Sequence, residues 1–276
     1  MHLAMVGDKL IDADNLDSAY LDYGTFFGDG VYEVLRSYNG KIFALEEHLA
    51  RFKRSLEEIE IEGVDISDIR AKVVTTWQKT GFANAKIYFH VTRGAGPRDH
   101  AAQGLTPRFF LMVSPLEESP EQKQNGISVI TTPDTRWKRC DIKSLNLLPN
   151  VLAKRLAHKR GCDEAIFVDD NGFITEGSSS AFFAIFAGKL HTSPLAVNIL
   201  PSITRLFVMK IYKNAGLDLL EKQTKAQDAT KADELFIAVS SKDIIPVVKF
   251  NEIKIADGKP GKFTKSLIEE FKKLVK

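Results

Sequence analysis

The sequence predicts a mixed α/β fold of the α+β kind, divided into two domains. Short stretches with the two-residue alternation of strands are interleaved with amphipathic stretches of helical period, which is the pattern of sheets covered by helices. A chain of 276 residues fits one or two domains. A polar stretch at residues 116–125, which contains Pro120, interrupts the apolar pattern. We therefore expect a small N-terminal domain at residues 1–117, a linker at 118–124 and a larger C-terminal domain at 125–276.

The N-terminal part begins with a glycine turn, Gly28–Glu33, that leads into a strand. This turn lacks the spacing of a dinucleotide-binding loop and precedes a strand instead of a helix, so we exclude that class of site. Apolar residues from Leu45 to Ile59 recur at helical spacing, and those from Ile87 to Val91 alternate as in a half-buried strand. The predicted elements are helices at 45–59 and at 66–80, the second ending near Gly81, and strands at 87–92 and 108–113.

The C-terminal part repeats the interleaving of strands and helices. Boundaries are set by glycine, proline and polar clusters between the apolar runs. The expected strands lie near 127–131, 164–168, 173–175, 181–186, 235–239 and 244–248, and the expected helices lie near 146–160, 203–215 and 262–275.

Composition and charge exclude several classes of protein. The formal net charge is +2, from 38 basic and 36 acidic side chains, so there is no electrostatic basis for binding nucleic acid. No apolar run approaches the roughly 20 residues that span a bilayer, and residues 1–12 do not form a secretory signal. Two cysteines, Cys140 and Cys162, provide neither a disulfide framework nor a metal site. We expect a cytoplasmic, enzyme-like protein without a metal.

Lys143 is a candidate catalytic amine. It stands just before an apolar helix start, where partial desolvation favours the neutral, nucleophilic form of a lysine. A lysine that merely extends from a helix end into solvent is the commoner arrangement. Lys143 alone therefore has a plain structural alternative.

Two further segments could face a ligand. In Thr175–Ser180, a carboxylate at a strand end is followed by glycine and three hydroxyls, which suits a ligand-facing loop and equally suits a polar turn. Leu200–Arg205 enters an apolar helix, whose free N–H groups and dipole favour a phosphate. Ordinary capping by Ser202, with Thr204 in the first turn, explains the same residues without a ligand.

A glycine- and proline-rich loop, Thr92–His100, leaves the strand at 87–92. Its Arg98 and His100 could converge on one carboxylate, because arginine offers a forked pair of donors. A solvated loop with incidental charges is the more frequent arrangement. The pair is informative only together with the other segments.

Taken in chain order, these segments resemble the fold-type IV aminotransferases, which use pyridoxal 5'-phosphate, and among them the bacterial D-amino acid aminotransferases. The resemblance runs from about Asp22 to Val248, and its most specific matches are Asp-Ile-Lys-Ser-Leu-Asn at 141–146 and Glu-Gly-Ser-Ser-Ser at 176–180. It implies a smaller N-terminal α/β domain, a larger C-terminal pseudo-barrel domain and a homodimer.

The resemblance also implies how the cofactor is held. Lys143 would form the Schiff base with the cofactor and move the proton between the substrate Cα and the cofactor. Glu176 would pair with the pyridine nitrogen and keep it protonated, so that the ring serves as an electron sink. Leu200 would pack against the ring. The phosphate would be held by Arg51, Ile203, Thr204 and Ser240.

Substrate choice follows from the same resemblance. The implied substrate residues are Tyr32, Arg98, His100, Ser179 and Ser180. Arg98 and His100 would reach the α-carboxylate from the partner subunit. Branched-chain and lyase relatives generally lack this Arg-x-His pair, so its presence favours D-amino acids. A carboxylate gripped on one side presents one Cα–H, and not its mirror image, to Lys143.

Two positions depart from the family pattern. Ala181 stands where an asparagine is usual, which puts the hydrogen bonding of the loop near the cofactor in question. Ser202 stands where many members have glycine, a change between small residues that we expect to be tolerated.

The sequence thus predicts a transaminase that moves the amino group of a D-amino acid such as D-alanine or D-glutamate to a 2-oxo acid such as 2-oxoglutarate or pyruvate, by a ping-pong mechanism. Alternatives within the same fold are a branched-chain L-amino acid aminotransferase, an (R)-amine transaminase and an aminodeoxychorismate lyase. A protein that keeps the scaffold and binds without catalysis is an alternative of a different kind.

Overall fold

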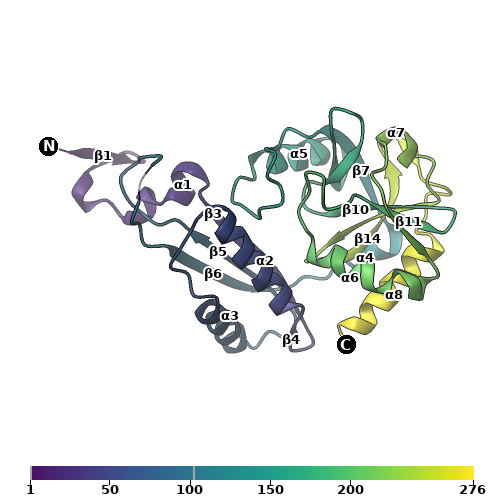
Figure 1. Cartoon of the computed structure of the whole chain (residues 1–276), viewed down its shortest axis with the longest axis horizontal. Helices are drawn as coiled ribbons and strands as arrows, with labels where there is room; N and C mark the ends of the chain where they lie inside the picture. Colours follow the sequence, from purple (N-terminus) through teal and green to yellow (C-terminus); the bar gives the residue numbers. More distant parts are fainter. Residues whose placement is uncertain (1, 102) are drawn as a thin grey trace.

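The structure, a computed structural model, describes residues 2–101 and 103–276. Figure 1 shows two lobes that lie side by side: one contains β3, β5 and β6 with α2 and α3, and the other contains β7, β10, β11 and β14 with α6 and α8. The predicted mixed α/β fold is confirmed. Among the described residues, no helix is both long enough and apolar enough to cross a membrane.

The first lobe contains the predicted helices and strands of the N-terminal part, and their ends agree with the prediction to within two residues. Gly81 adopts a left-handed conformation and ends the second predicted helix, as the sequence indicates. A short hairpin and a one-turn helix near the N-terminus were not predicted. The elements are β1 (Leu3–Val6), β2 (Lys9–Asp12), α1 (Tyr23–Phe27), β3 (Gly30–Tyr38), β4 (Lys41–Ile42), α2 (Leu45–Glu58), α3 (Ile66–Thr80), β5 (Ala85–Thr92) and β6 (Arg108–Pro115), with 3₁₀ turns at Ala13–Asn15 and Ser18–Leu21.

The antiparallel sheet of this lobe, with strand order β4-β3-β5-β6, has two different faces. Val31, Leu35 and Phe89 point toward α2 and α3 and form one apolar core with Phe52. Residues on the alternate positions, such as Tyr32, face the other way because side chains alternate along a strand. That second face forms one wall of the candidate site.

The second lobe contains the remaining predicted elements, with three corrections. The predicted linker is partly helical, because Pro120 begins a short helix in its first turn, where the missing N–H costs nothing. The helix expected at 146–160 starts two residues later, and the one expected at 203–215 tightens into a 3₁₀ turn. The elements are α4 (Pro120–Asn125), β7 (Ile127–Pro133), α5 (Leu148–Lys159), β8 (Glu164–Val168), β9 (Ile174–Gly177), β10 (Ala181–Phe186), β11 (Lys189–Thr192), α6 (Ile203–Ile211), a 3₁₀ turn (Tyr212–Ala215), β12 (Asp218–Glu221), α7 (Ala226–Ala229), β13 (Glu234–Val239), β14 (Asp243–Phe250), β15 (Ile253–Lys254) and α8 (Lys262–Leu274). The division at residues 118–124 remains a prediction.

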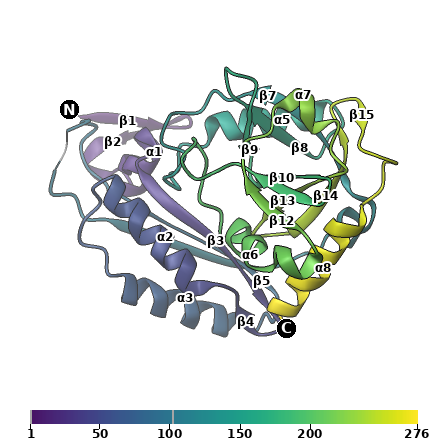
Figure 2. The same cartoon turned by 45° about the vertical axis from the view of Figure 1, so that its right-hand side comes forward.

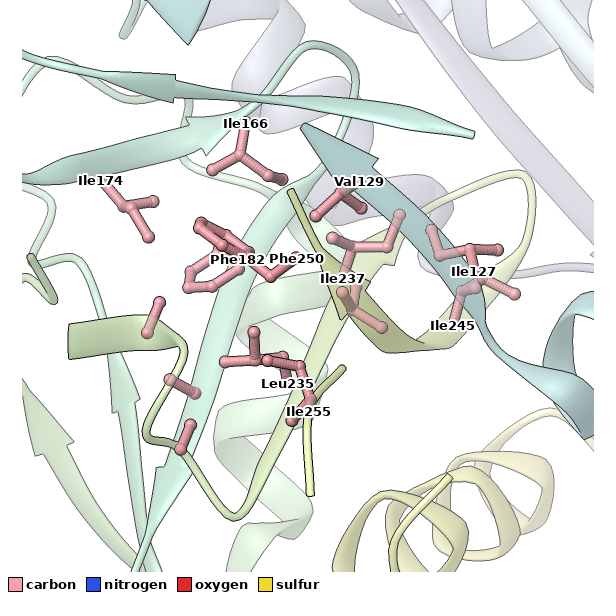
Figure 3. Close-up of a cluster of buried hydrophobic side chains, with 14 residues drawn as sticks. Ile127, Val129, Ile166, Ile174, Phe182, Leu235, Ile237, Ile245, Phe250 and Ile255 are labelled. Atoms are coloured by element: carbon pink, nitrogen blue, oxygen red, sulfur yellow. The ribbon is translucent and has the colours of Figure 1, made fainter. Parts of the chain in front are cut away.

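The sheet of the second lobe runs in the order β12-β11-β10-β13-β14-β7-β8-β9 and is curled. The inner face of this sheet encloses one apolar core, and helices cover its outer face, so its strands are apolar on both faces. Phe182 and Ile237 lie inside, in the cluster of Figure 3, with Phe250 and Ile166 from other strands. Phe183 and its neighbours face outward against α6 and α8, which cover that side in Figure 2.

A buried ionic cluster joins the two lobes. Asp243, at the start of β14, accepts hydrogen bonds from Arg36 on β3 at 3.3 Å and from Lys123 on α4 at 2.7 Å. The hydroxyl of Tyr38 also donates to this carboxylate. Asp243 has a φ of 64°, a left-handed conformation that persists only where surrounding contacts enforce it. The cluster therefore fixes the turn between β13 and β14, which carries Ser240.

Candidate active site

A cavity of about 430 Å³ lies between the outer face of the small sheet and the edge of the curled sheet. Its walls come from β3, from the segment between β7 and α5, from the β9–β10 loop, from the start of α6 and from the turn after β13. These segments are far apart in sequence, and each ends or bends at the cavity. The sequence-predicted residues that line the cavity are Tyr32, Arg51, Lys143, Glu176, Ser179, Ser180, Leu200 and Ser240.

Lys143 is held against β3 by its backbone. The N–H of Tyr32 donates to the carbonyl of Lys143 at 3.0 Å, and the N–H of Leu145 donates to Gly30 at 2.9 Å. The N–H of Lys143 donates to the hydroxyl of Ser55 at 3.2 Å. The ammonium nitrogen lies 4.2 Å from the centroid of the Tyr32 ring. Lys143 therefore points into the cavity from a fixed position, packed on an aromatic face.

Glu176 is buried at the end of β9 and faces a cation that the sequence analysis missed. Arg136 contacts Glu176 and makes a forked pair with Asp134, at 2.9 and 2.8 Å. The N–H of Leu200 donates to both oxygens of Glu176 at 3.2 Å. Burial raises the pKa of Glu176, and the charge of Arg136 offsets only part of that rise.

No sequence pattern marked Arg136 as a buried residue or as part of a site. It follows a strand in a charged stretch, Asp134–Asp141, which has the composition of a solvated loop. Burial alone would raise the pKa of Asp134, but the hydrogen bonds and charge of Arg136 outweigh burial and hold that pKa below its ordinary value. Arg136 thus keeps two buried carboxylates in one place, one of them at the cavity wall.

The loop after Glu176 is organised by a second residue that was missed, Glu164 on β8. The hydroxyls of Ser178, Ser179 and Ser180 all donate to the Glu164 carboxylate, with distances of 2.7 Å for Ser179 and 3.4 Å for Ser180. The amide of Asn150 donates to the carbonyl of Ser178 at 2.8 Å. These bonds hold the loop that precedes Ala181, and none of them involves the side chain at position 181.

Gly177 is required by this packing. A Cβ at this position would lie 2.2 Å from the hydroxyl oxygen of Ser180, well inside van der Waals contact. Ser179 and Ser180 therefore sit at the cavity wall with their hydroxyl protons directed to Glu164. Their oxygen lone pairs stay available as acceptors.

The start of α6 forms the anion-binding end of the site. Ser202 caps the helix, since its hydroxyl accepts from the N–H of Arg205 at 3.1 Å, and Ser202 lines the cavity. The first N–H groups of a helix have no partner within it, so they can meet a phosphate. Ile203 and Thr204 are buried and line a small adjoining cleft together with Ser240.

Arg51, on α2, reaches this end of the cavity through a buried network. Its Nε and Nη2 donate to the two oxygens of Glu33 at 2.8 Å each, and its Nη1 donates to the carbonyl of Pro201 at 2.9 Å. His48 Nδ1 lies 2.7 Å from Glu33. Burial by itself would raise the pKa of Glu33, but the charge of Arg51 and the hydrogen bonds from Arg51 and His48 outweigh burial and lower it to about 2.

The low pKa of Glu33 predicts how stability depends on pH. Because the folded pKa lies below the ordinary 4.5, ionised Glu33 stabilises the fold above that pH, and this contribution is lost as the pH falls from 4.5 toward 2. The difference corresponds to about 3 kcal/mol. We expect Glu33→Gln to lower the free energy of unfolding by about that amount at pH 7, with a smaller loss near pH 3. Urea unfolding at both pH values measures it, and an equal loss at both would contradict this assignment.

Arg98 and His100 lie on the exposed loop after β5, away from the wall of the cavity. The guanidinium of Arg98 lies 5.0 Å from the centroid of Phe27, and the ring of His100 lies 4.8 Å from the same centroid. The hydroxyl of Tyr23 donates to the carbonyls of Pro97 and Asp99, which anchors the loop. Within one chain neither residue lines the cavity that Lys143 faces. His100 lines a neighbouring pocket together with Ser144 and Asn146, which also border the cavity.

Comparison with known proteins agrees with this geometry. The family model described as amino-transferase class IV matches residues 30–250. A D-alanine aminotransferase of Bacillus licheniformis is 40% identical over 251 residues, covering 89% of this chain and 87% of the relative. A D-alanine aminotransferase of Staphylococcus haemolyticus is 35% identical, covering 100% of this chain and 98% of the relative. The Escherichia coli branched-chain amino acid aminotransferase shares the fold, with a TM-score of 0.87, 23% identity and coverage of 97% and 92%. The chain belongs to the class IV aminotransferases.

Proposed function

We propose that this aminotransferase uses pyridoxal 5'-phosphate to move the amino group of a D-amino acid to a 2-oxo acid. The observation that carries the proposal is that one cavity combines the amine of Lys143, the buried carboxylate of Glu176 and the start of α6. The D-alanine aminotransferases that match the chain over most of its length support the choice of a D-amino acid.

The donors in the cavity fit this cofactor. An amine is needed for its aldehyde, and Lys143 supplies one. A carboxylate is needed for its pyridine nitrogen, and Glu176 is buried, carries the hydrogen bonds from Leu200 and faces the cavity. A dianionic phosphate needs cationic and N–H donors, which Arg51, the start of α6 and the hydroxyl of Ser240 offer at one end. The three requirements are met by residues from separate segments that meet only in the fold.

When bound, the cofactor supplies an electron sink for the electrons of the bond broken at the substrate Cα. The protein supplies the rest. Lys143 would move the proton from the substrate Cα to the cofactor in the first half-reaction, and from the cofactor to the Cα of the bound acceptor in the second. Tyr32 and the backbone of β3 fix its position. Glu176, held by Arg136 and Leu200, would pair its carboxylate with the ring nitrogen of the cofactor. Apolar Leu200 and Ile142 reduce the access of water to the cavity.

The choice between mirror-image substrates would depend on the grip on the α-carboxylate. We propose that Tyr32 acts from the same chain and that Arg98 and His100 act across the interface of a homodimer. Their exposure, and their absence from the wall of the cavity in their own chain, support this arrangement, since both side chains are then free to contact a second copy.

Two exposed apolar faces support the homodimer. On α5, Leu148, Leu152 and Leu156 recur at every fourth position along one side, and the first two are 66% and 55% exposed. On the outer face of β6, Phe110 and Met112 are each about half exposed. Contiguous apolar surface of this kind usually marks a protein interface. Both faces border the segments that form the cavity, so a second copy seated there would complete the site.

The half-reaction tests the proposal. D-alanine or D-glutamate, added to the cofactor-loaded protein without a 2-oxo acid, should bleach its long-wavelength absorption, and pyruvate should restore it. L-leucine should leave the band unchanged. Faster bleaching by L-leucine would identify a branched-chain enzyme, and bleaching by (R)-1-phenylethylamine an amine transaminase. Release of pyruvate from aminodeoxychorismate without an amino acceptor would identify a lyase.

A further inference from the structure

We propose that Glu33 is a positioning residue for the cofactor phosphate, acting through Arg51. This inference rests on the proposed function, since it assumes that the cavity receives a pyridoxal phosphate. Glu33 would not touch the phosphate itself. It would set the angle at which the guanidinium of Arg51 presents its remaining N–H groups.

The placement of Glu33 is unusual for an acid. Along β3 it shares a face with Val31 and Leu35, which are core residues packed against α2 and α3, and its exposed fraction is 0%. A carboxylate in an apolar core is costly unless it is paired and hydrogen-bonded. An aliphatic side chain would fill this strand position without that cost, so the charge has to be explained by what Glu33 holds.

Glu33 holds Arg51 in a single orientation. An arginine has five N–H donors. Two of them are used by the oxygens of Glu33 and a third by the carbonyl of Pro201, all at 2.8–2.9 Å. One N–H on each terminal nitrogen remains, and Arg51 lines the cavity. The same contacts tie Arg51 to Pro201, the residue before the cap of α6, so both halves of the anion site are fixed relative to each other.

His48 completes the arrangement. An ionised carboxylate can only accept, so the His48 Nδ1 at 2.7 Å must carry a proton and donate it to Glu33. Burial lowers the pKa of His48, which keeps the ring neutral near pH 7. Glu33 and Arg51 then carry opposite charges, and the sum over the three side chains is zero.

Because the three side chains sum to zero charge, two possible roles of Arg51 in binding phosphate can be distinguished. If Arg51 acted by charge alone, Glu33 would weaken the binding of phosphate, and removal of its charge would strengthen binding. If Arg51 acts by the geometry of its N–H groups, removal of Glu33 should weaken binding. A glutamine at position 33 would turn an amide N–H₂ toward a donor of Arg51 or His48 and disturb the fork, so the two roles predict opposite signs.

The experiment compares two probes on the folded apoprotein: pyridoxal 5'-phosphate, and pyridoxal, which lacks the phosphate. We expect Glu33→Gln to weaken binding of the phosphorylated probe by about tenfold or more and to leave the Kd for pyridoxal within about twofold. The ³¹P resonance of the bound phosphorylated probe should also shift. Glu33→Asp keeps the charge but shortens the reach, and should resemble the glutamine variant. If Glu33→Gln does not fold, Glu33→Asp is used in the same comparison.

Glu234→Gln is the matched control. Glu234 is also a buried carboxylate, but it accepts from the N–H groups of Phe263 and Thr264 at the start of α8, away from the cavity. This variant should lose stability and keep both Kd values. Equal or tighter binding of pyridoxal 5'-phosphate by folded Glu33→Gln would overturn the proposal. If the wild-type protein binds pyridoxal 5'-phosphate no better than pyridoxal, the phosphate site is absent and both proposals fail. If only the variant comparison fails, the proposed function stands.

Discussion

Replacing Lys143 by alanine is expected to lower the rate of transamination by about 10⁴-fold or more, because one amine both bonds the cofactor and transfers the proton at Cα. The rest of the cofactor shell is untouched by this change, since Glu176 is held by Arg136 and Arg51 by Glu33. We therefore expect the variant to fold and to bind pyridoxal 5'-phosphate without a covalent bond. Single-turnover absorbance with D-alanine measures the loss.

Borohydride reduction gives the control for this variant. Lys154 also lines the cavity, 3.4 Å from Glu164. The reduced adduct should be found on residue 143 in the wild-type protein and in Lys154→Ala, and should be missing in Lys143→Ala. An adduct on Lys154, or activity that survives in Lys143→Ala, would end the assignment of the catalytic amine.

The same variant tests whether Arg98 acts across a dimer. Neither Lys143→Ala nor Arg98→Ala should be active alone. When the two are mixed and refolded, a dimer with one subunit of each kind would carry one intact site if Arg98 acts in the partner's cavity. About a quarter of the wild-type activity should then return. No recovery, with mixed dimers present, would place Arg98 in its own subunit's site.

Replacing Arg136 by methionine is expected to lower the free energy of unfolding at pH 7 by about 3–5 kcal/mol, the usual effect of removing one partner from a buried ion pair. Asp134 and Glu176 would both remain buried without their shared cation. The variant should also bind the cofactor more weakly, since a protonated Glu176 no longer favours a protonated ring nitrogen. Denaturant unfolding and cofactor titration measure the two effects.

The pH dependence of this loss can be predicted in sign. Arg136 holds the pKa of Asp134 below its ordinary 3.8. The ion pair therefore stabilises the fold fully above pH 3.8, and this stabilisation is lost as the pH falls from 3.8 toward the lower pKa of the folded state. The difference between the variant and the wild type should therefore shrink on acidification. Arg139→Met is a suitable control, because Arg139 makes its ion pairs with Asp141 and Glu58 at the surface and its loss should be nearly neutral. Equal effects of the two substitutions would show that burial of Arg136 contributes nothing.

Much of the secondary structure could be predicted because local periodicity reports which side of an element is buried. The apolar stripe of residues 45–59 and the alternation at 87–92 became α2 and β5. The order of the motifs around Lys143, Glu176 and Ser202 indicated the family, and these residues do line one cavity. Short elements such as α4 and β1 were missed, since three to six residues carry too little periodic signal.

The amino-acid sequence by itself determined the helices and strands with strong periodicity and the family, and it indicated Lys143 as the candidate amine. Only the tertiary structure decided which polar groups support that amine's surroundings. Arg136 meets Glu176 across 40 positions of sequence, Glu33 meets Arg51 across 18 and Glu164 meets Ser178 across 14. Periodicity records whether a position is buried, but the partner of a buried charge is set by how strands and helices from distant segments pack, and no local pattern contains that information.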